Sequence, residues 1–268
     1  MEWQRRTVVR DGVALAVRDG GGDGPPVVLL HGLAGHAGEW DATARSLRSR
    51  HRVVAFDQRG HGASARRPAD VSRAAYVADV VAVLDALGLE RAVLAGQSLG
   101  GHTALLTAAA HPDRVAALVL VDASPGGPHP ESPGAIGGWL RGWPVPFATR
   151  EAAVEHLGGG AVGEGWAAGL ERRADGWWPR FDPDVMVAAL AENATRSWWP
   201  EWEAVACPAL AVLGQDSFVD PDEVAGMFAR RPDDTYGACV PGTGHDLHLE
   251  RPDALHAVLA AFLESVAP

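Results

Sequence analysis

The chain has 268 residues, of which 47% are hydrophobic and 21% are charged, and its formal net charge at pH 7 is −11. This composition is typical of a soluble globular protein, and the acidic balance disfavours nucleic acids and anionic membranes as partners. All 23 basic residues are arginine, which excludes any mechanism that requires a lysine.

No apolar run approaches the length needed to cross a bilayer. The first residues lead into an alternating pattern rather than the apolar core of a signal peptide, so we expect a cytoplasmic protein. Cys207 and Cys239 lack metal-ligand spacing. Both lie in apolar strand-like runs, so we expect two buried reduced thiols.

The first half of the chain alternates between predicted strands and helices. Asp11-Gly12 is a hairpin signal between two short strands. Continuous apolar runs predict further strands at 26–30, 52–56, 91–95 and 115–121, and helices are predicted at 39–50, 77–87 and 101–110. Strands without polar alternation are buried on both faces, so we predict an α/β fold with a mostly parallel sheet and helices on both sides.

The strand–helix rhythm breaks at Ser124 and resumes with a strand at 209–213, followed by a helix at 223–230, a strand at 237–240 and a last helix at 252–266. The stretch between is rich in Gly and Pro and holds eight of the ten tryptophans. We predict one core domain, 1–124 and 203–268, with a Trp-rich helical lid at 125–202. The tryptophans could form an aromatic roof over a pocket, or only pack the lid itself.

Gly96-Gln97-Ser98-Leu99-Gly100 lies between the apolar run at 91–95 and the predicted helix at 101–110. A serine at such a strand-to-helix turn has a strained backbone, and only small flanking residues leave room for it. Its hydroxyl is held at a helix N-terminus, where negative charge is favoured. The pattern predicts Ser98 as a nucleophile, although a glycine-rich turn with a capping serine would share the local sequence.

A serine nucleophile needs a base, and the base needs an orienting acid. His245 follows a strand on a Gly-rich loop, which makes it the predicted base. The ends of the other predicted strands carry His31, Asp57 and Asp122. In a parallel sheet the active residues gather at this carboxyl edge.

The chain resembles the α/β-hydrolase superfamily at His31-Gly32, Asp57 to Ser64, Gly96 to Gly101, and Gly244-His245 followed by Glu250-Arg251-Pro252. The resemblance implies an α/β-hydrolase fold with a nucleophile elbow and a catalytic triad in the order serine, acid, histidine. It also implies an oxyanion hole made of the backbone amides of Leu99 and Leu33.

The acid has three candidates. In relatives of this type the strand before the acid usually ends in Gly-x-x-Asp, and here the stretch is Gly214-Gln215-Asp216-Ser217, with Asp216 one residue early. We favour Asp216, because a loop can correct that shift. Asp122 is the main alternative, since some family members place the acid after the preceding core strand. Asp220, before Pro221, has the sequence of a helix cap instead.

The predicted function is that of a serine hydrolase that cleaves a carboxylic ester or lactone of a hydrophobic small molecule through an acyl-enzyme. This mechanism implies neither a metal nor an organic cofactor. The resemblance excludes epoxide hydrolases and haloalkane dehalogenases, which need an aspartate where Ser98 stands, and hydroxynitrile lyases, which need a lysine. Carbon–carbon bond hydrolases, thioesterases and cofactor-free perhydrolases remain open. A different class is also open, a ligand sensor with weak hydrolase activity.

Overall fold

The computed structural model describes residues 2–266, and its centre is one eight-stranded sheet in the order β1-β2-β4-β3-β5-β6-β9-β10. The pairs β1–β2 and β2–β4 are antiparallel, and the other five pairs are parallel. The strands are β1 (Gln4–Arg10), β2 (Val13–Asp19), β3 (Pro26–Leu30), β4 (Arg52–Phe56), β5 (Ala92–Gln97), β6 (Val115–Val121), β9 (Ala209–Gly214) and β10 (Thr235–Val240). The predicted mostly parallel sheet is confirmed.

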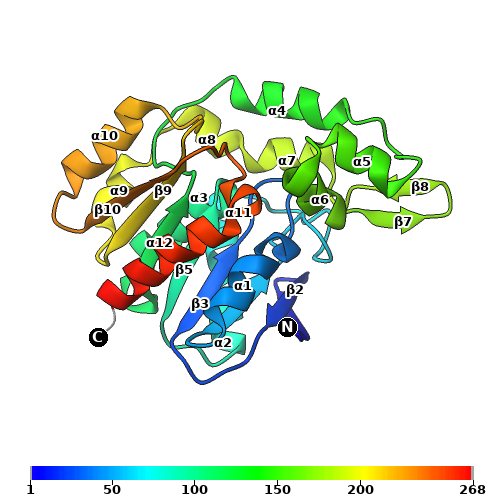
Figure 1. Ribbon diagram of the computed structural model, residues 1–268. Coiled ribbons are helices and arrows are strands. Elements are labelled where there is room, and N and C mark those ends of the chain that lie inside the picture. The colour runs from blue at the N-terminus through cyan, green and yellow to red at the C-terminus, as the bar shows by residue number, and fades with distance from the viewer. Residues whose placement is uncertain (1, 267–268) are drawn as a thin grey trace.

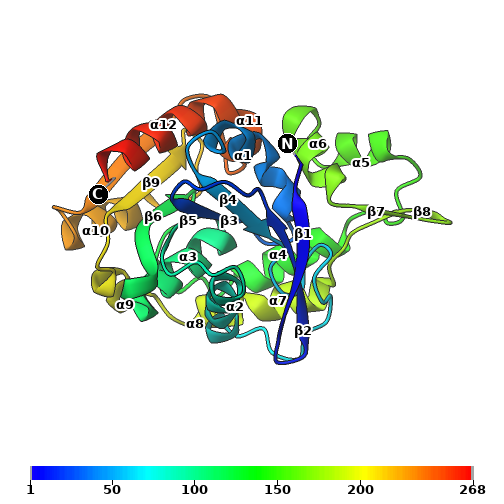
Figure 2. The ribbon, with the colours of Figure 1, turned by 90° about the horizontal axis from the view of Figure 1, so that it is seen from below.

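Helices cover both faces of the sheet (Figure 2). One face carries α1 (Asp41–Leu47), α11 (Leu247–Glu250) and α12 (Pro252–Ser265), and the other carries α2 (Arg73–Ala86), α3 (Leu99–Ala110) and α9 (Trp199–Ala204). Helix α10 (Pro221–Arg230) follows β9, and two short 3-10 helices lie at Ala37–Trp40 and Pro112–Arg114. Strands β3 and β5 are almost wholly buried, which explains their continuous apolar sequences. No helix within residues 2–266 is long and apolar enough to cross a membrane.

Between β6 and β9 the chain leaves the sheet and forms a layer over the carboxyl ends of the parallel strands (Figure 1). The elements of this layer are α4 (Ser132–Arg141), α5 (Arg150–His156), α6 (Gly160–Ala168), α7 (Pro183–Ala189), α8 (Ala191–Thr195) and a small hairpin of β7 (Glu171–Arg173) and β8 (Gly176–Trp178). The layer has its own apolar cluster, to which Trp143, Phe147, Phe181 and Met186 belong. The segment predicted as helical therefore also contains a short antiparallel pair of strands.

The tryptophans of this segment are mainly packing residues. Trp139, Trp143 and Trp166 meet edge to face, with ring centroids 5.3–6.0 Å apart. Trp198 and Trp202 are buried in the core of the main domain, beneath α3. These contacts agree with the packing interpretation and not with an aromatic roof over a pocket.

A buried ion pair joins the loop after β4 to α2. Arg59 donates two hydrogen bonds of 2.6 Å to the carboxylate of Asp79, and Arg10 donates a third of 2.7 Å. The side chains of Arg59 and Asp79 are each only 1% exposed. Removing one partner of such a pair leaves a charge buried without compensation.

We therefore expect Asp79→Ala to lower the free energy of unfolding by about 3–5 kcal/mol, measured by urea denaturation. Asp85, which pairs with Arg114 at the surface and is 61% exposed, supplies the matched control. Asp85→Ala should cost less than about 1 kcal/mol. Equal losses of unfolding free energy in the two variants would contradict the conclusion that the buried ion pair of Asp79 stabilises the fold.

Candidate active site

Ser98 lies at the turn between β5 and α3 with φ 50° and ψ −119°, a conformation that L residues rarely adopt. The strain is of order 1–3 kcal/mol. A Cβ atom added to Gly96 would lie 2.2 Å from the carbonyl carbon of Gly100, and one added to Gly100 would lie 2.3 Å from the Leu30 oxygen. Only glycine fits on either side of this serine, which is the physical basis of the motif.

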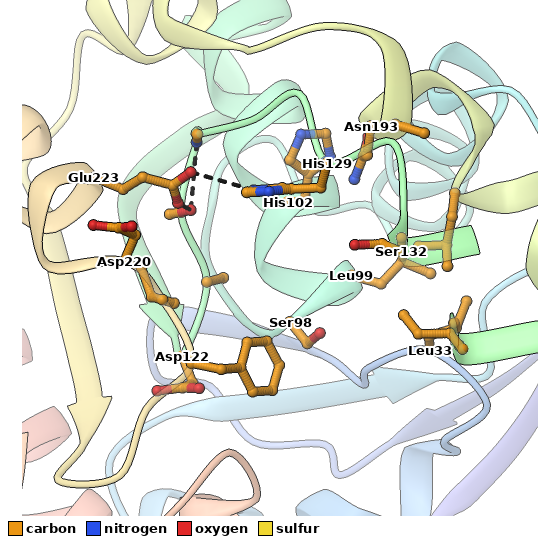
Figure 3. Close-up of a pocket in the computed structure, with 18 of the residues that line it drawn as sticks. Leu33, Ser98, Leu99, His102, Asp122, His129, Ser132, Asn193, Asp220 and Glu223 are labelled. Carbon is orange, nitrogen blue, oxygen red and sulfur yellow. Dashed lines mark hydrogen bonds and ion pairs between the residues drawn. The ribbon is translucent and has the colours of Figure 1, made fainter. Parts of the chain in front are cut away.

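Two backbone amides next to Ser98 are free. Leu99 is the first residue of α3, and Leu33 lies on the loop after β3. Neither amide has a hydrogen-bond acceptor anywhere in residues 2–266. Ser98 lies between Leu33 and Asp122 in Figure 3. The residues predicted to form the oxyanion hole are thus beside the predicted nucleophile, with unused donors.

His31 braces the loop that carries Leu33. Its Nδ1 lies 2.7 Å from the Gly32 oxygen, and its Nε2 accepts from the Gln58 amide at 2.9 Å. Full burial lowers the pKa of His31 below its ordinary value, so the ring stays neutral and can accept at one nitrogen and donate at the other. His31 is therefore a structural support of the site.

His245, the predicted base, is held by Asp122. Its Nδ1 lies 2.7 Å from Oδ2 of Asp122, whose side chain is fully buried. The other carboxylate oxygen of Asp122 accepts from the Gly214 amide at 3.1 Å. Asp122 follows β6 with φ 47°, and this turn directs its carboxylate toward the histidine loop. The base and its partner thus follow the carboxyl ends of two different parallel strands, β10 and β6.

The structure does not bring Asp216, the favoured candidate for the acid, to His245. Its side chain is exposed and forms no hydrogen bond or ion pair with His245 in the described residues, and its backbone amide donates to the Thr243 oxygen at 2.9 Å. Asp220 caps α10 by accepting from the Asp222 amide at 2.8 Å, as its sequence indicates. Asp122 is thus the only one of the three candidates that the structure brings to His245.

Ser98 and His245 are linked through neighbouring residues, and no hydrogen bond joins their side chains in the described structure. Gln97, the residue before Ser98, donates from its side chain to the His245 backbone oxygen at 3.2 Å. Phe218 contacts the His245 ring and also lines the cavity at Ser98. Bonds between nucleophile and base are often long before substrate binds, so this geometry is compatible with a triad.

A cavity of about 500 Å³ opens above Ser98. Its apolar side includes Leu33, Leu99, Ile136, Leu190 and Phe218. Besides Asp122, its polar side includes the carboxylates of Glu131, Asp220 and Glu223, and no arginine lines this cavity among the described residues. No tryptophan lines it either, although part of its wall comes from the segment 125–202.

Sequence reasoning missed Glu223 and His102 in the cavity wall. Glu223 accepts from the Gly127 amide at 3.0 Å and pairs with His129 at 3.2 Å, which ties the start of the segment 125–202 to α10 (Figure 3). His102 accepts at Nδ1 from Arg73 at 3.2 Å, and burial lowers its pKa well below the ordinary value. Its position four residues after Ser98 on α3 was the one signal for a cavity-facing side chain.

Known proteins share this architecture. Residues 25–157 match the sequence model of the alpha/beta hydrolase fold. The sn-1-specific diacylglycerol lipase ABHD11 of Mus musculus is 31% identical over 259 residues, covering 91% of this chain and 83% of that protein. The chain belongs to the α/β-hydrolase family. This α/β hydrolase is also 29% identical to esterase YbfF of Escherichia coli, over 89% of its own length and 92% of the relative.

A solved structure agrees with the assignment. The thermophilic esterase from Thermogutta terrifontis superposes on this α/β hydrolase with a TM-score of 0.78 and 26% identity, covering 99% of this chain and 100% of that one. The predicted fold and family are therefore confirmed, and the chain is a hydrolase.

Proposed function

We propose that this α/β hydrolase cleaves carboxylic esters, lactones included, of small uncharged molecules through an acyl-enzyme on Ser98. The observation that carries the proposal is the convergence at one cavity of the strained Ser98 turn, the residues with the two free amides, and Asp122, whose carboxylate holds His245. Relatives and neighbours named as lipase and esterases support an ester as the bond cleaved.

In the proposed mechanism the Ser98 oxygen attacks the ester carbonyl while Nε2 of His245 takes its proton. The 2.7 Å bond to Asp122 holds the other ring proton at Nδ1, so that Nε2 is free to accept. The amides of Leu33 and Leu99 stabilise the oxyanion, a contribution of about 3–4 kcal/mol for each donor. His245 then protonates the leaving alcohol, and water activated by the same ring releases the acid.

The cavity favours an uncharged substrate. Glu131, Asp220 and Glu223 contribute carboxylates to its polar side. Like charges in a partly enclosed site repel, so an acyl chain that ends in a carboxylate should bind poorly. A short neutral ester such as p-nitrophenyl butyrate is the suitable first probe.

A fluorophosphonate tests the proposal, since such reagents react preferentially with an activated serine. We expect one equivalent to react with Ser98, located by mass spectrometry of the modified peptide, and hydrolysis of p-nitrophenyl butyrate to fall in proportion to labelling. Many turnovers before labelling would exclude a sensor with single-turnover chemistry. Full activity after complete labelling, or an adduct on another residue, would overturn the proposal.

A further inference from the structure

The loop after β9 places an aromatic ring on the imidazole of His245. The ring centroids of Phe218 and His245 are 3.9 Å apart, with 38° between the ring planes. Phe218 is 70% exposed, more than any other large hydrophobic residue of the described chain. It lies on the loop where the sequence led us to expect the acid, and this loop therefore supplies a ring to His245 instead of a carboxylate.

The position of Phe218 is determined by its backbone. The Ser217 amide donates to the Gly214 oxygen at 3.3 Å, and the Val219 amide donates to the Ser217 hydroxyl at 3.1 Å. Asp216 before this turn is tied to Thr243 on the histidine loop, and Asp220 after it caps α10. Both flanks of Phe218 are thus anchored.

Burial does not explain this residue. A side chain that stays 70% exposed gains little from the hydrophobic effect. Its one ring–ring contact within the described residues is with His245, and it also lines the cavity that contains Ser98.

We propose that Phe218 is a positioning residue for His245 whose ring face stabilises the imidazolium formed when His245 takes the Ser98 proton. The inference rests on the proposed function. A cation within about 6 Å of an aromatic centroid is attracted by the ring quadrupole, whereas neutral imidazole lacks this charge–quadrupole attraction. The contact is thus stronger in the transition state than in the resting enzyme, which is what raises kcat.

Other charged groups lie on the elements next to His245, and none of them is removed when Phe218 is replaced. Asp122 faces Nδ1, and Asp246 on the same loop accepts from the Trp166 indole at 3.1 Å. Glu250 of α11 accepts from the Gly244 amide at 3.0 Å. The loop after β9 and α10 contribute Asp216, Asp220 and Glu223. A shift in the pH profile of a Phe218 variant therefore reports the ring itself.

The test compares Phe218→Leu with Phe218→Trp, using p-nitrophenyl butyrate between pH 4.5 and 9. We expect Phe218→Leu to lower kcat about two- to fivefold with little change in KM. The acid limb of kcat/KM should move to lower pH by about 0.4–0.7 unit, because the imidazolium loses a stabilising partner. Phe218→Trp should restore both. Tyr236→Leu is the control, because it also removes a partly exposed aromatic ring, one that is 46% exposed and packs on Phe262. It should change neither kcat nor the acid limb.

The direction of the shift separates this role from simple shielding. A ring that only kept water away would disfavour the imidazolium, so its removal would move the acid limb to higher pH. An upward shift, no shift, or failure of Phe218→Trp to restore the profile would overturn the inference. Titration of the His245 ring by NMR in the same variants gives the direction without turnover. Failure of the proposed function would show differently, as hydrolysis that does not depend on Ser98.

Discussion

Ser98→Ala is expected to lower kcat/KM for p-nitrophenyl butyrate by about 10⁵- to 10⁶-fold. The nucleophile is lost, and water cannot occupy the same position relative to His245 and the free amides of Leu33 and Leu99. What remains is the smaller acceleration that the oxyanion hole and binding supply by themselves. Steady-state kinetics on independently purified batches measure the loss and expose any contaminating esterase.

The same variant should keep its fold. Ala at position 98 meets the same positive φ as Ser, and the Ser98 hydroxyl has no hydrogen-bond partner in residues 2–266 whose loss would cost stability. The free energy of unfolding, measured by urea denaturation, should therefore change by less than about 1 kcal/mol. Ser46→Ala is the matched serine control. It removes a 3.3 Å hydrogen bond from the Ser46 hydroxyl to the Ala42 backbone oxygen on α1 and should keep full activity. Retention of more than about 1% of activity by folded Ser98→Ala would refute the nucleophile assignment.

Much of this site could be predicted because its determinants are local. The turn at Ser98 requires glycine at Gly96 and Gly100, since a Cβ at either would overlap the backbone. Such a requirement leaves a direct trace in the sequence. The continuous apolar strands β3, β5 and β6 did the same for the sheet, because burial on both faces removes the polar alternation.

The acid could not be predicted because its choice is not local. Strands β6 and β9 are neighbours, with Val121 opposite Val212, so Asp122 and Asp216 both follow strand ends at one edge. Which carboxylate reaches His245 depends on backbone angles after each strand. Asp122 turns at φ 47°, whereas Asp216 is tied through its amide to Thr243. Neither feature has a spacing or composition signature.

The role of the tryptophans could not be decided from the sequence for a related reason. Their number in the segment 125–202 is a property of composition, and composition does not say which side of a short helix a ring occupies. The structure directs Trp143 into the segment's own core and Trp202 into that of the main domain. The cavity wall is formed instead by smaller residues such as Ile136, Ser132 and Asn193.

Asp122→Asn is expected to lower kcat by about 10⁴-fold with little change in KM. The Gly214 amide, which now donates to Oδ1 of Asp122 at 3.1 Å, should hold the carbonyl oxygen of the new amide side chain. Its NH₂ group then faces Nδ1 of His245 and donates to it. The ring proton is forced onto Nε2, where it blocks transfer from Ser98, and the imidazolium loses its counter-charge.

Asp216→Asn is the matched control, because it makes the same chemical change one strand away. The Asp216 side chain is exposed and has no bond to His245 in the described structure, so activity should stay within about twofold. The two variants therefore decide between the two strand ends. A loss of about 10⁴-fold in Asp216→Asn with an active Asp122→Asn would mean that the loop after β9 rearranges when substrate binds. In that case Phe218 could not remain on His245, and the pairing of Asp122 with His245 would describe a resting state only.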